Sequence, residues 1–283
     1  MYRQQIIDRL DKIYEVPTML SIATEVERLT NDSRTTAEQI GQVLKNDPAL
    51  TAKVLKLANS AIFAKSHRVV SINHAVASLG FDKICEMTVT ITFLNGFKSK
   101  FINYQTFWTH SLAVAFLAVK LNDICHASVN PDRLFTGGIL HDIGVILLDN
   151  YFTDLYKKVF SIATNKKFEL TLVEQSVLGI THSEVGAIML NKWRIPGQIT
   201  DIICYHHTPQ KAKLVQTDAK LIYLANFIAN NRGFDNGTGT FTEHFYDDIF
   251  EELGLTIADI PAVIDSVKDE VEKAKQLLRI GGR

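Results

Sequence analysis

The sequence has little of what marks a secreted or disulfide-stabilised protein. It contains three cysteines, Cys85, Cys125 and Cys204, which lie far apart, are odd in number and form no CxxC pair. This pattern argues against a disulfide framework or a thiolate zinc knot, and it is typical of reduced cytosolic thiols. Charged residues such as Arg3 interrupt the first ten residues, which therefore lack the apolar core of a signal peptide. We expect a cytoplasmic protein.

A membrane-length apolar run and an excess of basic charge are also missing. The stretch 107–121 comes nearest to a membrane span, but it contains His110 and Lys120 and falls short of the roughly 20 residues required. A buried core helix is the better interpretation. The 30 Lys and Arg residues balance 31 Asp and Glu residues, so the general electrostatic footprint of a nucleic-acid binder is not indicated. We expect neither a membrane nor nucleic acid as a direct partner.

Residues that break helices are scarce, and signals that start them recur. Six prolines and 15 glycines interrupt a chain of 283 residues, of which 46% are hydrophobic. The capping-box pattern, in which side chains satisfy free backbone donors at a helix start, is matched by Thr35 with Glu38, Thr171 with Glu174, and Thr181 with Glu184. Asp47 before Pro48 predicts another helix start. Apolar residues spaced by three and four predict helices over 19–29, 48–61 and 171–178.

Two stretches need separate interpretation. Residues 87–93 are rich in β-branched side chains and favour a strand, but no partner strand lies nearby, so we predict a helix. Residues 230–242 are rich in Gly, Asn and Thr and predict an exposed loop that separates the main body from a tail. The tail, 245–278, is acidic early and basic late, which predicts one or two amphipathic helices.

The histidines provide the strongest indication of a functional site. His141 and Asp142 follow an apolar, glycine-containing run that should carry both side chains inside the fold. A buried ionised carboxylate is unfavourable unless a cation or hydrogen-bond donors compensate it, so a metal ion explains the pair. Imidazole and carboxylate suit Fe, Mn, Zn or Ni, in a mononuclear or dinuclear site. The candidate ligands are His110, His141, Asp142, His182, His206 and His207; no catalytic residue is assigned.

Other interpretations of these residues stay open. His110 lies in an apolar helix and fits a hydrogen-bonded core histidine, and a His–Asp pair such as His141–Asp142 also occurs by chance. On a helix His206 and His207 would diverge by about 100°, which suits two metal positions, or one metal and one ligand. The remaining histidines, which are surface or structural residues in this interpretation, are His67, His74, His126 and His244.

Two blocks of sequence resemble the HDOD family, a branch of the HD superfamily of metal-dependent phosphohydrolases. The first block comprises residues 46–61, 71–76 and 79–80, and the second comprises 138–144, 181–187 and 205–207. The resemblance runs from about Val16 to Asn230. It implies an all-α fold of two helical lobes, with an N-terminal lobe (1–100) packed on an HD-like core (101–232) that holds the His/Asp pocket, followed by a helical tail (240–283).

The resemblance extends to the HD-GYP cyclic-di-GMP phosphodiesterases, whose histidine and HD positions are matched by the six candidate ligands. Three positions depart from those relatives: Val145 replaces a lysine, Asn226 replaces a metal-binding aspartate, and Thr106 replaces a glutamate found in some of them. A lysine stabilises charge that develops on phosphate in the transition state, and an aspartate anchors the metal that activates water. Valine and asparagine do not supply these functions.

The sequence therefore favours a bacterial signalling module without phosphohydrolase activity, which retains a metal site and acts through a protein partner or a nucleotide-type ligand. The alternative is a metal-dependent phosphohydrolase or cyclic-dinucleotide phosphodiesterase. Other chemistry on an HD scaffold, including oxygen activation at a di-iron site, is a third hypothesis.

Overall fold

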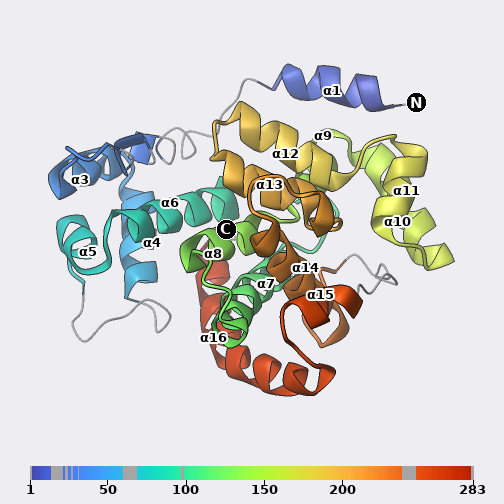
Figure 1. Ribbon diagram of the computed structural model, residues 1–283. Coiled ribbons are helices and arrows are strands. Elements are labelled where there is room, and N and C mark those ends of the chain that lie inside the picture. Colours follow the sequence, from blue (N-terminus) through green and yellow to red (C-terminus); the bar gives the residue numbers. More distant parts are fainter. Residues whose placement is uncertain are drawn as a thin grey trace. The chain divides into compact units, whose positions relative to one another are not determined.

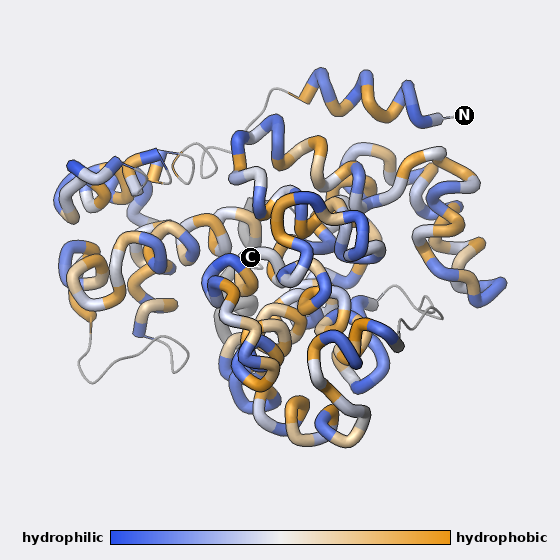
Figure 2. The backbone as a smooth tube through the Cα atoms, in the orientation of Figure 1, coloured by the Kyte–Doolittle hydropathy of each residue, from blue (hydrophilic) through white to orange (hydrophobic). Residues whose placement is uncertain are grey.

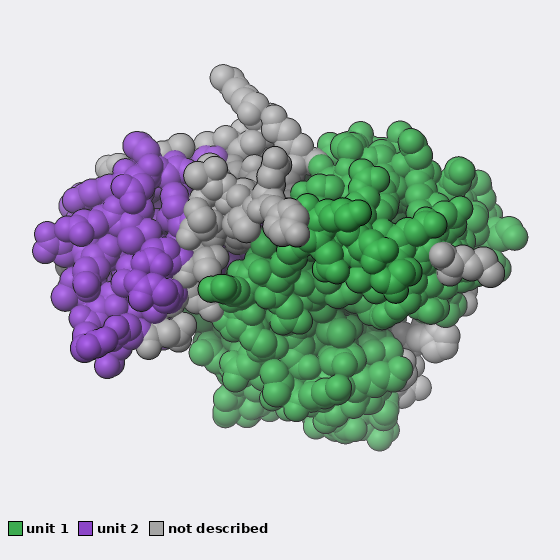
Figure 3. Space-filling model, turned by 90° about the horizontal axis from the view of Figure 1, so that it is seen from above, with its two compact units in different colours: residues 1–14, 97–271 green, residues 15–96, 272–283 purple. Residues whose placement is uncertain are grey.

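The computed structural model describes residues 2–13, 22, 25–26, 28–30, 32–59, 69–96, 99–237 and 247–281. All regular secondary structure in these residues is helical, as the sequence predicts (Figure 1). The chain divides into two compact units (Figure 3): unit 1 comprises residues 1–14 and 97–271, and unit 2 comprises residues 15–96 and 272–283. Each unit is described by itself.

Four helices lie wholly within the described residues of unit 2. They are α3 (Ala37–Lys45), α4 (Pro48–Ala58), α5 (Ile72–Leu79) and α6 (Phe81–Gly96). Their apolar faces form one core in which Ile40, Leu50 and Ile84 are fully buried. The start of α4 confirms the predicted cap, because the Asp47 side chain accepts a hydrogen bond from the Leu50 N–H and Pro48 is the first helical residue.

Two local predictions in unit 2 have different outcomes. Residues 87–93 lie inside α6, and the Thr88 hydroxyl donates to the Ile84 carbonyl, which satisfies a polar group that the helix would otherwise bury. The helix prediction is confirmed there. The cap of α3 is Thr36 with Gln39, whereas Thr35 with Glu38 was predicted. The two overlapping pairs fit the same pattern, so spacing alone did not separate them.

The predicted helix 19–29 lies partly outside the described residues. Of this stretch, residues 22, 25–26 and 28–29 are described, and they are helical.

Unit 1 begins with α1 (Arg3–Asp11), which is tied to distant parts of the same unit. Arg3 donates to the Gly179 carbonyl at 2.8 Å and to the Glu184 carboxylate at 2.7 Å. Lys192 donates to the Leu10 carbonyl at 3.0 Å. These contacts are the reason that α1 groups with residues far along the sequence and not with the helices that follow it.

The body of unit 1 is a helical core around α7 (Tyr104–Cys125). The other helices of this body are α8 (Pro131–Leu140), α9 (Ile143–Tyr151), α10 (Thr153–Lys166), α11 (Leu170–Val177), α12 (His182–Lys192), α13 (Gly197–Tyr205), η1 (Pro209–Lys211) and α14 (Gln216–Asn231). Helix α7 packs against α8 and α14, and α12 packs against α9 and α13. Most of α7 is buried, as expected for a core helix. Among the described residues, none of the helices combines the length and the apolar character that crossing a membrane requires.

Two glycines allow these helices to approach closely. A Cβ atom on Gly138 would lie 2.4 Å from the Ala115 Cα in α7, and one on Gly144 would lie 1.9 Å from the His182 carbonyl oxygen in α12. Both distances are far below van der Waals contact, so no side chain fits at either position without a backbone shift. His141 and Asp142 lie between α8 and α9. The glycines that flank them therefore allow this turn to pack directly against α7 and α12.

The C-terminal part of the described chain contains α15 (Asp247–Glu252), η2 (Ile257–Asp259) and α16 (Ile260–Gly281). Two described helices in this region agree with the expectation of one or two. Figure 2 shows hydrophobic and hydrophilic stretches alternating along α16, as in an amphipathic helix. Residues up to Val271 group with unit 1.

The sequence prediction for α11 needs two corrections. The helix follows Glu169, whose side chain forms no capping bond, and the predicted capping residue Glu174 is fully buried and bonded elsewhere. Leu172 is one of the apolar residues whose spacing predicted this helix. It is 57% exposed and does not belong to the packed face. The capping pattern is a local signal and carries no information about a tertiary partner for Glu174.

Candidate metal centre

Six side chains from four parts of unit 1 meet at one point. His110 lies on α7, and His141 and Asp142 form the turn between α8 and α9. His182 is the first residue of α12, while His206 and His207 follow the end of α13. The structure thus brings together all six residues that the sequence singled out, and His207 alone of them is partly exposed.

Asp142 is at the centre of this cluster. Its Oδ1 lies 3.2 Å from the His182 Nε2 and 3.4 Å from the His206 Nε2. Its Oδ2 lies 3.3 Å from the His141 Nε2 and 3.9 Å from the His110 Nε2. Each oxygen of the Asp142 carboxylate therefore faces a different pair of rings.

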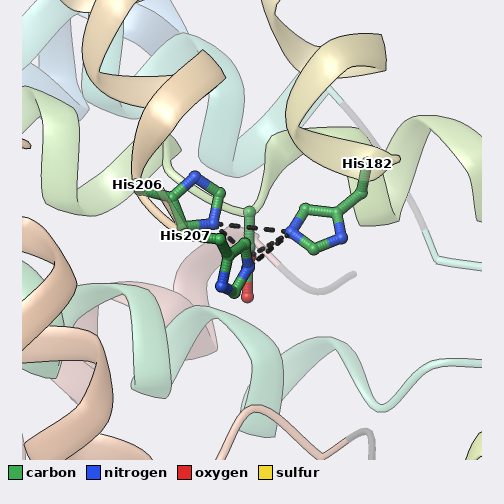
Figure 4. Close-up of side chains that lie close together, drawn as sticks. His182, His206 and His207 are labelled. Carbon is green, nitrogen blue, oxygen red and sulfur yellow. Dashed lines mark hydrogen bonds and ion pairs between the residues drawn. The ribbon is translucent and has the colours of Figure 1, made fainter. Parts of the chain in front are cut away.

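The rings also approach one another through their Nε2 atoms. The His182 Nε2 lies 3.0 Å from the His207 Nε2 and 3.4 Å from the His206 Nε2 (Figure 4). On the other side of Asp142, the Nε2 atoms of His110 and His141 are 3.3 Å apart.

The opposite nitrogen of most of these rings is bound to a carbonyl group. Nδ1 lies 2.6 Å from the Phe234 carbonyl in His110, 2.8 Å from the Gly138 carbonyl in His141, and 2.8 Å from the Ile203 carbonyl in His206. A carbonyl oxygen only accepts, so each Nδ1 carries the proton and each neutral ring presents an Nε2 lone pair to the cluster. This is the arrangement that histidine ligands of metals adopt.

His182 has a different partner, which sequence reasoning missed. Its Nδ1 lies 2.9 Å from the Glu174 carboxylate, which also accepts the His182 backbone N–H at 2.9 Å and the Tyr156 hydroxyl at 2.6 Å. Both Glu174 and Tyr156 are fully buried. A buried carboxylate of this kind fixes the ring and makes it a stronger electron donor.

The cluster distributes charge unevenly. Burial lowers the pKa of His110 and of His206 to about 4. Burial opposes the charged form of His182 as well, but the carboxylates of Glu174 and Asp142 outweigh it and raise the pKa of this ring to about 10. Desolvation opposes ionisation of Asp142, yet the neighbouring histidines hold the pKa of its carboxyl well below the usual range. The Asp142 carboxylate therefore stays anionic. Together with the rings around it, it favours a cation at the centre of the cluster.

His206 and His207 correct one expectation. The 100° divergence assumed a continuous helix, but α13 ends at Tyr205 and both residues lie in the following turn. Their ring centroids are 4.1 Å apart, and both Nε2 atoms approach His182 (Figure 4). The two rings thus serve the same group.

Two sets of ligand atoms in this cluster are close enough to hold a metal ion. One set is His110, His141 and Asp142, and the other is Asp142, His182, His206 and His207; within each set the atoms lie within 4.8 Å of one another. Nε2 atoms and a carboxylate oxygen converge at 3.0–3.4 Å, where lone pairs repel one another unless a proton on His182 or a metal cation lies between them. The residues present therefore fit one or two metal ions, with Asp142 common to both sets.

A pocket of about 510 Å³ opens onto the cluster. Asp142, His182 and His207 of the cluster line it, together with residues of α11, the start of α12, the end of α13, η1 and α14. The volume is that of a small-molecule site.

Three positions depart from the HD-GYP pattern to which the sequence was compared. Val145 is fully buried in α9 and does not line the pocket. Asn226 does line it, and its Oδ1 accepts a hydrogen bond from Asn230 at 2.7 Å. Thr106 contacts the segment after α14, since a Cβ on Gly237 would lie 3.0 Å from its Cγ2 atom.

That segment confirms the predicted exposed loop in part, since residues 232–237 form no helix and most of them are exposed, but it also makes contacts with the site that were not predicted. Residues 230 and 231 belong to α14, the Phe234 carbonyl binds His110, and the Asn236 amide donates to the Asp142 Oδ2 at 3.3 Å. Residues 232–237 are thus part of the site, which composition alone did not indicate. The stretch 238–242 lies outside the described residues.

The fold and the cluster define an all-helical protein with an HD-type pocket. The HDOD domain model matches residues 16–209, more than half of the chain, and the protein belongs to this family.

Solved structures share the fold. An HDOD domain protein of unknown function from Geobacter sulfurreducens is 25% identical, with a TM-score of 0.77 and 98% of each chain covered. A candidate phosphohydrolase from Shewanella amazonensis SB2B is 23% identical, with a TM-score of 0.76, covering 96% of this chain and 97% of that one. A candidate signal transduction protein from Marinobacter aquaeolei VT8 is 19% identical, with a TM-score of 0.75, covering 99% of this chain and 66% of that one.

An uncharacterised protein of Treponema pallidum is 22% identical over 202 residues. The match covers 71% of this chain but 39% of that curated relative.

Proposed function

We propose that this HDOD protein is a bacterial regulatory module in which His110, His141, Asp142, His182, His206 and His207 hold one or two metal ions, and in which the centre binds a ligand without hydrolysing phosphodiesters. The observation that carries the proposal is the charge around the pocket. Among the described residues that line it, Lys211 is the one lysine or arginine, and it is an exposed residue of η1, far in sequence from Val145.

Phosphoryl transfer needs positive charge at the phosphate oxygens beyond that of the metal. Val145 is apolar and buried, so it offers no such charge. Asn226 is neutral and its oxygen is already engaged by Asn230, which leaves Asp142 as the one carboxylate among the candidate ligands. The residues thus support metal binding better than they support hydrolysis.

The signalling role rests on family membership and on one relative. The Marinobacter aquaeolei protein of the same fold is a candidate signal transduction protein. A metal centre that does not turn over substrate is consistent with such a role. In this role a protein partner or a nucleotide-type ligand binds according to the state of the pocket.

The alternative is a metal-dependent phosphohydrolase, and the complete set of histidines favours it, as does the fold shared with the Shewanella amazonensis candidate phosphohydrolase. In that case the bound metal would supply an activated water molecule. The chain's own residues would orient the centre, with Glu174 holding His182 and Asn236 holding Asp142.

Elemental analysis of the purified protein, followed by assays of the metal-loaded form with phosphomonoesters, nucleotides and cyclic dinucleotides, tests the proposal. We expect bound metal that is lost in Asp142→Ala, because Asp142 is common to both sets of ligands, and no turnover above that of free metal in buffer. Turnover by the wild-type protein that Asp142→Ala abolishes would establish the phosphohydrolase instead. A pocket that binds no Fe, Mn, Zn or Ni would contradict both proposals.

A further inference from the structure

Residues 232–237, which follow α14, form a strap against the candidate metal centre. None of the six is helical, and four of them are exposed. Phe234 and Asn236 are partly buried, and both contact the cluster. A segment that buries so little surface opens at a low free energy unless specific contacts hold it. The contacts of these two residues are therefore central to keeping the strap in place.

The strap contains two glycines in the left-handed region of the backbone. Gly233 has φ +96° and Gly237 has φ +72°, conformations that residues with a Cβ rarely adopt. A Cβ on Gly237 would also lie 3.0 Å from the Thr106 Cγ2 atom near the start of α7. The chain can therefore turn at Gly233 and pass close to α7 at Gly237, which places the residues between them against the cluster.

Two groups of the strap hold two residues of the same ligand set. The Phe234 carbonyl accepts a hydrogen bond from the His110 Nδ1 at 2.6 Å, and the Asn236 amide donates to the Asp142 Oδ2 at 3.3 Å. His110 and Asp142 form one candidate set together with His141. The strap is thus bonded to two of the three side chains that would hold a metal ion at this position.

Metal at this position would strengthen both bonds. An ion on the His110 Nε2 occupies the lone pair of that nitrogen, so the ring proton stays on Nδ1, and it draws electron density from the ring, which makes the Nδ1–H a better donor to the strap. An ion bound to Asp142 also fixes the carboxylate that accepts from Asn236. Coupling between two equilibria is reciprocal, so a strap that metal stabilises raises the affinity for metal by the same factor.

We infer that residues 232–237 are a metal-dependent strap, which bound metal holds closed on His110 and Asp142 and which opens when the metal is removed, and that Asn236 is its positioning side chain. Asn236 lines the pocket together with Asn230, whose side chain accepts the Asn236 N–H at 3.4 Å. Opening of the strap therefore changes the wall of the pocket, and the loaded and empty proteins present different surfaces.

The inference rests on the proposed metal centre and names a regulatory element of that centre. Asn236 acts through Asp142 and takes part in no chemical step.

Hydrogen–deuterium exchange of the full-length protein, loaded with Zn²⁺ or treated with chelator at the same pH, tests the strap. The strap amides with acceptors in the structure are those of Phe234, Asn236 and Gly237. We expect Zn²⁺ to slow their exchange at least tenfold. The reference amides are those of Lys213, Leu214 and Val215, which donate to the Asp201 carboxylate outside the cluster. Their exchange should change less than twofold.

Variants of Asn236 test its positioning role, with Zn²⁺ affinity measured by competition with a chromophoric chelator. Asn236→Ala should lower the affinity about tenfold and remove most of the protection of the strap, because Asp142 loses the amide that holds it. Asn236→Gln keeps the amide and should restore both. Asn231→Ala is the matched control, since Asn231 is exposed at the end of α14, bonds to the Phe227 carbonyl and does not line the pocket. It should behave as the wild-type protein does.

Bound Zn²⁺ that leaves exchange in the strap unchanged overturns the inference while the proposed metal centre stands. The inference is also overturned if Asn236→Ala matches the wild-type protein in affinity and protection, or if Asn236→Gln restores neither. A protein that binds no Zn²⁺ overturns the inference, and one that binds no Fe, Mn or Ni either contradicts the metal centre itself. Turnover of a phosphoester would contradict the proposed function without affecting these outcomes.

Discussion

At the scale of single residues, four of the five clustered histidines are held by partners outside the cluster. Three rings donate to backbone carbonyls and the fourth, His182, is bound by Glu174. These bonds fix the orientation of the four rings, and in His110, His141 and His206 they also select the tautomer, before any metal arrives. Glu174 is the most informative of the partners, because it is a side chain that substitution can change without altering the backbone.

Glu174→Gln should lower metal affinity about 10- to 100-fold while the protein stays folded, because the amide keeps the shape of the side chain but loses the charge that holds His182. Competition with a chromophoric chelator measures the affinity, and circular dichroism monitors the fold. Glu251→Gln, an exposed residue of α15, is the matched control and should leave the affinity unchanged. Equal affinities of Glu174→Gln and wild type would mean that the carboxylate does not act on the centre.

The lowered pKa values of His110 and His206 predict how the metal-free protein responds to acid. Both pKa values are about 4 in the folded protein, against about 6.5 when the chain is unfolded. Between these values the unfolded chain binds more protons, so the free energy of unfolding falls as the pH drops from 6.5 to 4. His182, with its pKa raised to about 10, contributes with the opposite sign and loses its contribution as the pH rises through that value.

Urea unfolding of chelator-treated protein from pH 7 to pH 4 measures this dependence. We expect the free energy of unfolding to fall as the pH drops from 6.5 to 4. It should fall less steeply in His206→Gln, which removes one of the titrating rings. The same decline in wild type and in His206→Gln would show that the ring does not titrate with the lowered pKa.

At the scale of elements, the site depends on how closely the α8–α9 turn approaches its neighbours. Gly144 touches the backbone of His182 at the start of α12, and Gly138 touches α7. Helix packing thus positions these candidate ligands.

Gly144→Ala should separate α9 from α12 and move His182 away from Asp142, since the added carbon would lie 1.9 Å from the His182 carbonyl oxygen. Overpacking of this kind is unfavourable by about 1–3 kcal/mol or more. We expect a lower melting temperature together with loss of metal. Gly197→Ala at the start of α13 is the control, because its Cβ would meet only the Leu214 side chain at 3.6 Å. Retention of metal by Gly144→Ala would contradict this account of the packing.

The same scale shows how much of the structure the sequence predicts. The cap of Thr181 with Glu184 and the N-cap Asp47 are present, because capping is a local interaction within one turn. The pattern at Thr171 and Glu174 was equally good but wrong, because the fold gives Glu174 a partner on another helix.

Long-range contacts account for the other errors. Asn236 reaches Asp142 across 94 residues and Phe234 reaches His110 across 124, and no local spacing indicates either contact. The six candidate ligands were recognisable because their residue types are those of metal ligands. The residues that hold them in place were not, because glutamate, tyrosine and asparagine occur in many other roles.

At the scale of the whole molecule, the complete cluster lies in unit 1, together with the pocket that opens onto it. A metal that binds the folded state and not the unfolded chain stabilises that unit by about 2.7 kcal/mol at a free concentration 100 times its dissociation constant. Chelation should therefore lower the melting temperature of unit 1 by roughly 5–10 °C, given the usual shift of about 2–4 °C per kcal/mol for domains of this size.

Differential scanning fluorimetry with and without chelator measures this shift. Asp142→Ala, which removes the ligand common to both sets, is the control, and it should melt at the same temperature in both conditions. A wild-type protein whose melting temperature does not respond to chelator would contradict the stabilising role of the metal.

The most direct test of the metal centre is anomalous scattering from crystals of the protein, collected above and below the absorption edge of the metal found by elemental analysis. The account predicts one or two anomalous peaks at metal–ligand distances of about 2.0–2.3 Å, one between Asp142 and the His182–His206–His207 group and any second between Asp142 and the His110–His141 pair. A metal-containing protein with no anomalous peak among these side chains, or with peaks elsewhere on the chain, would contradict it.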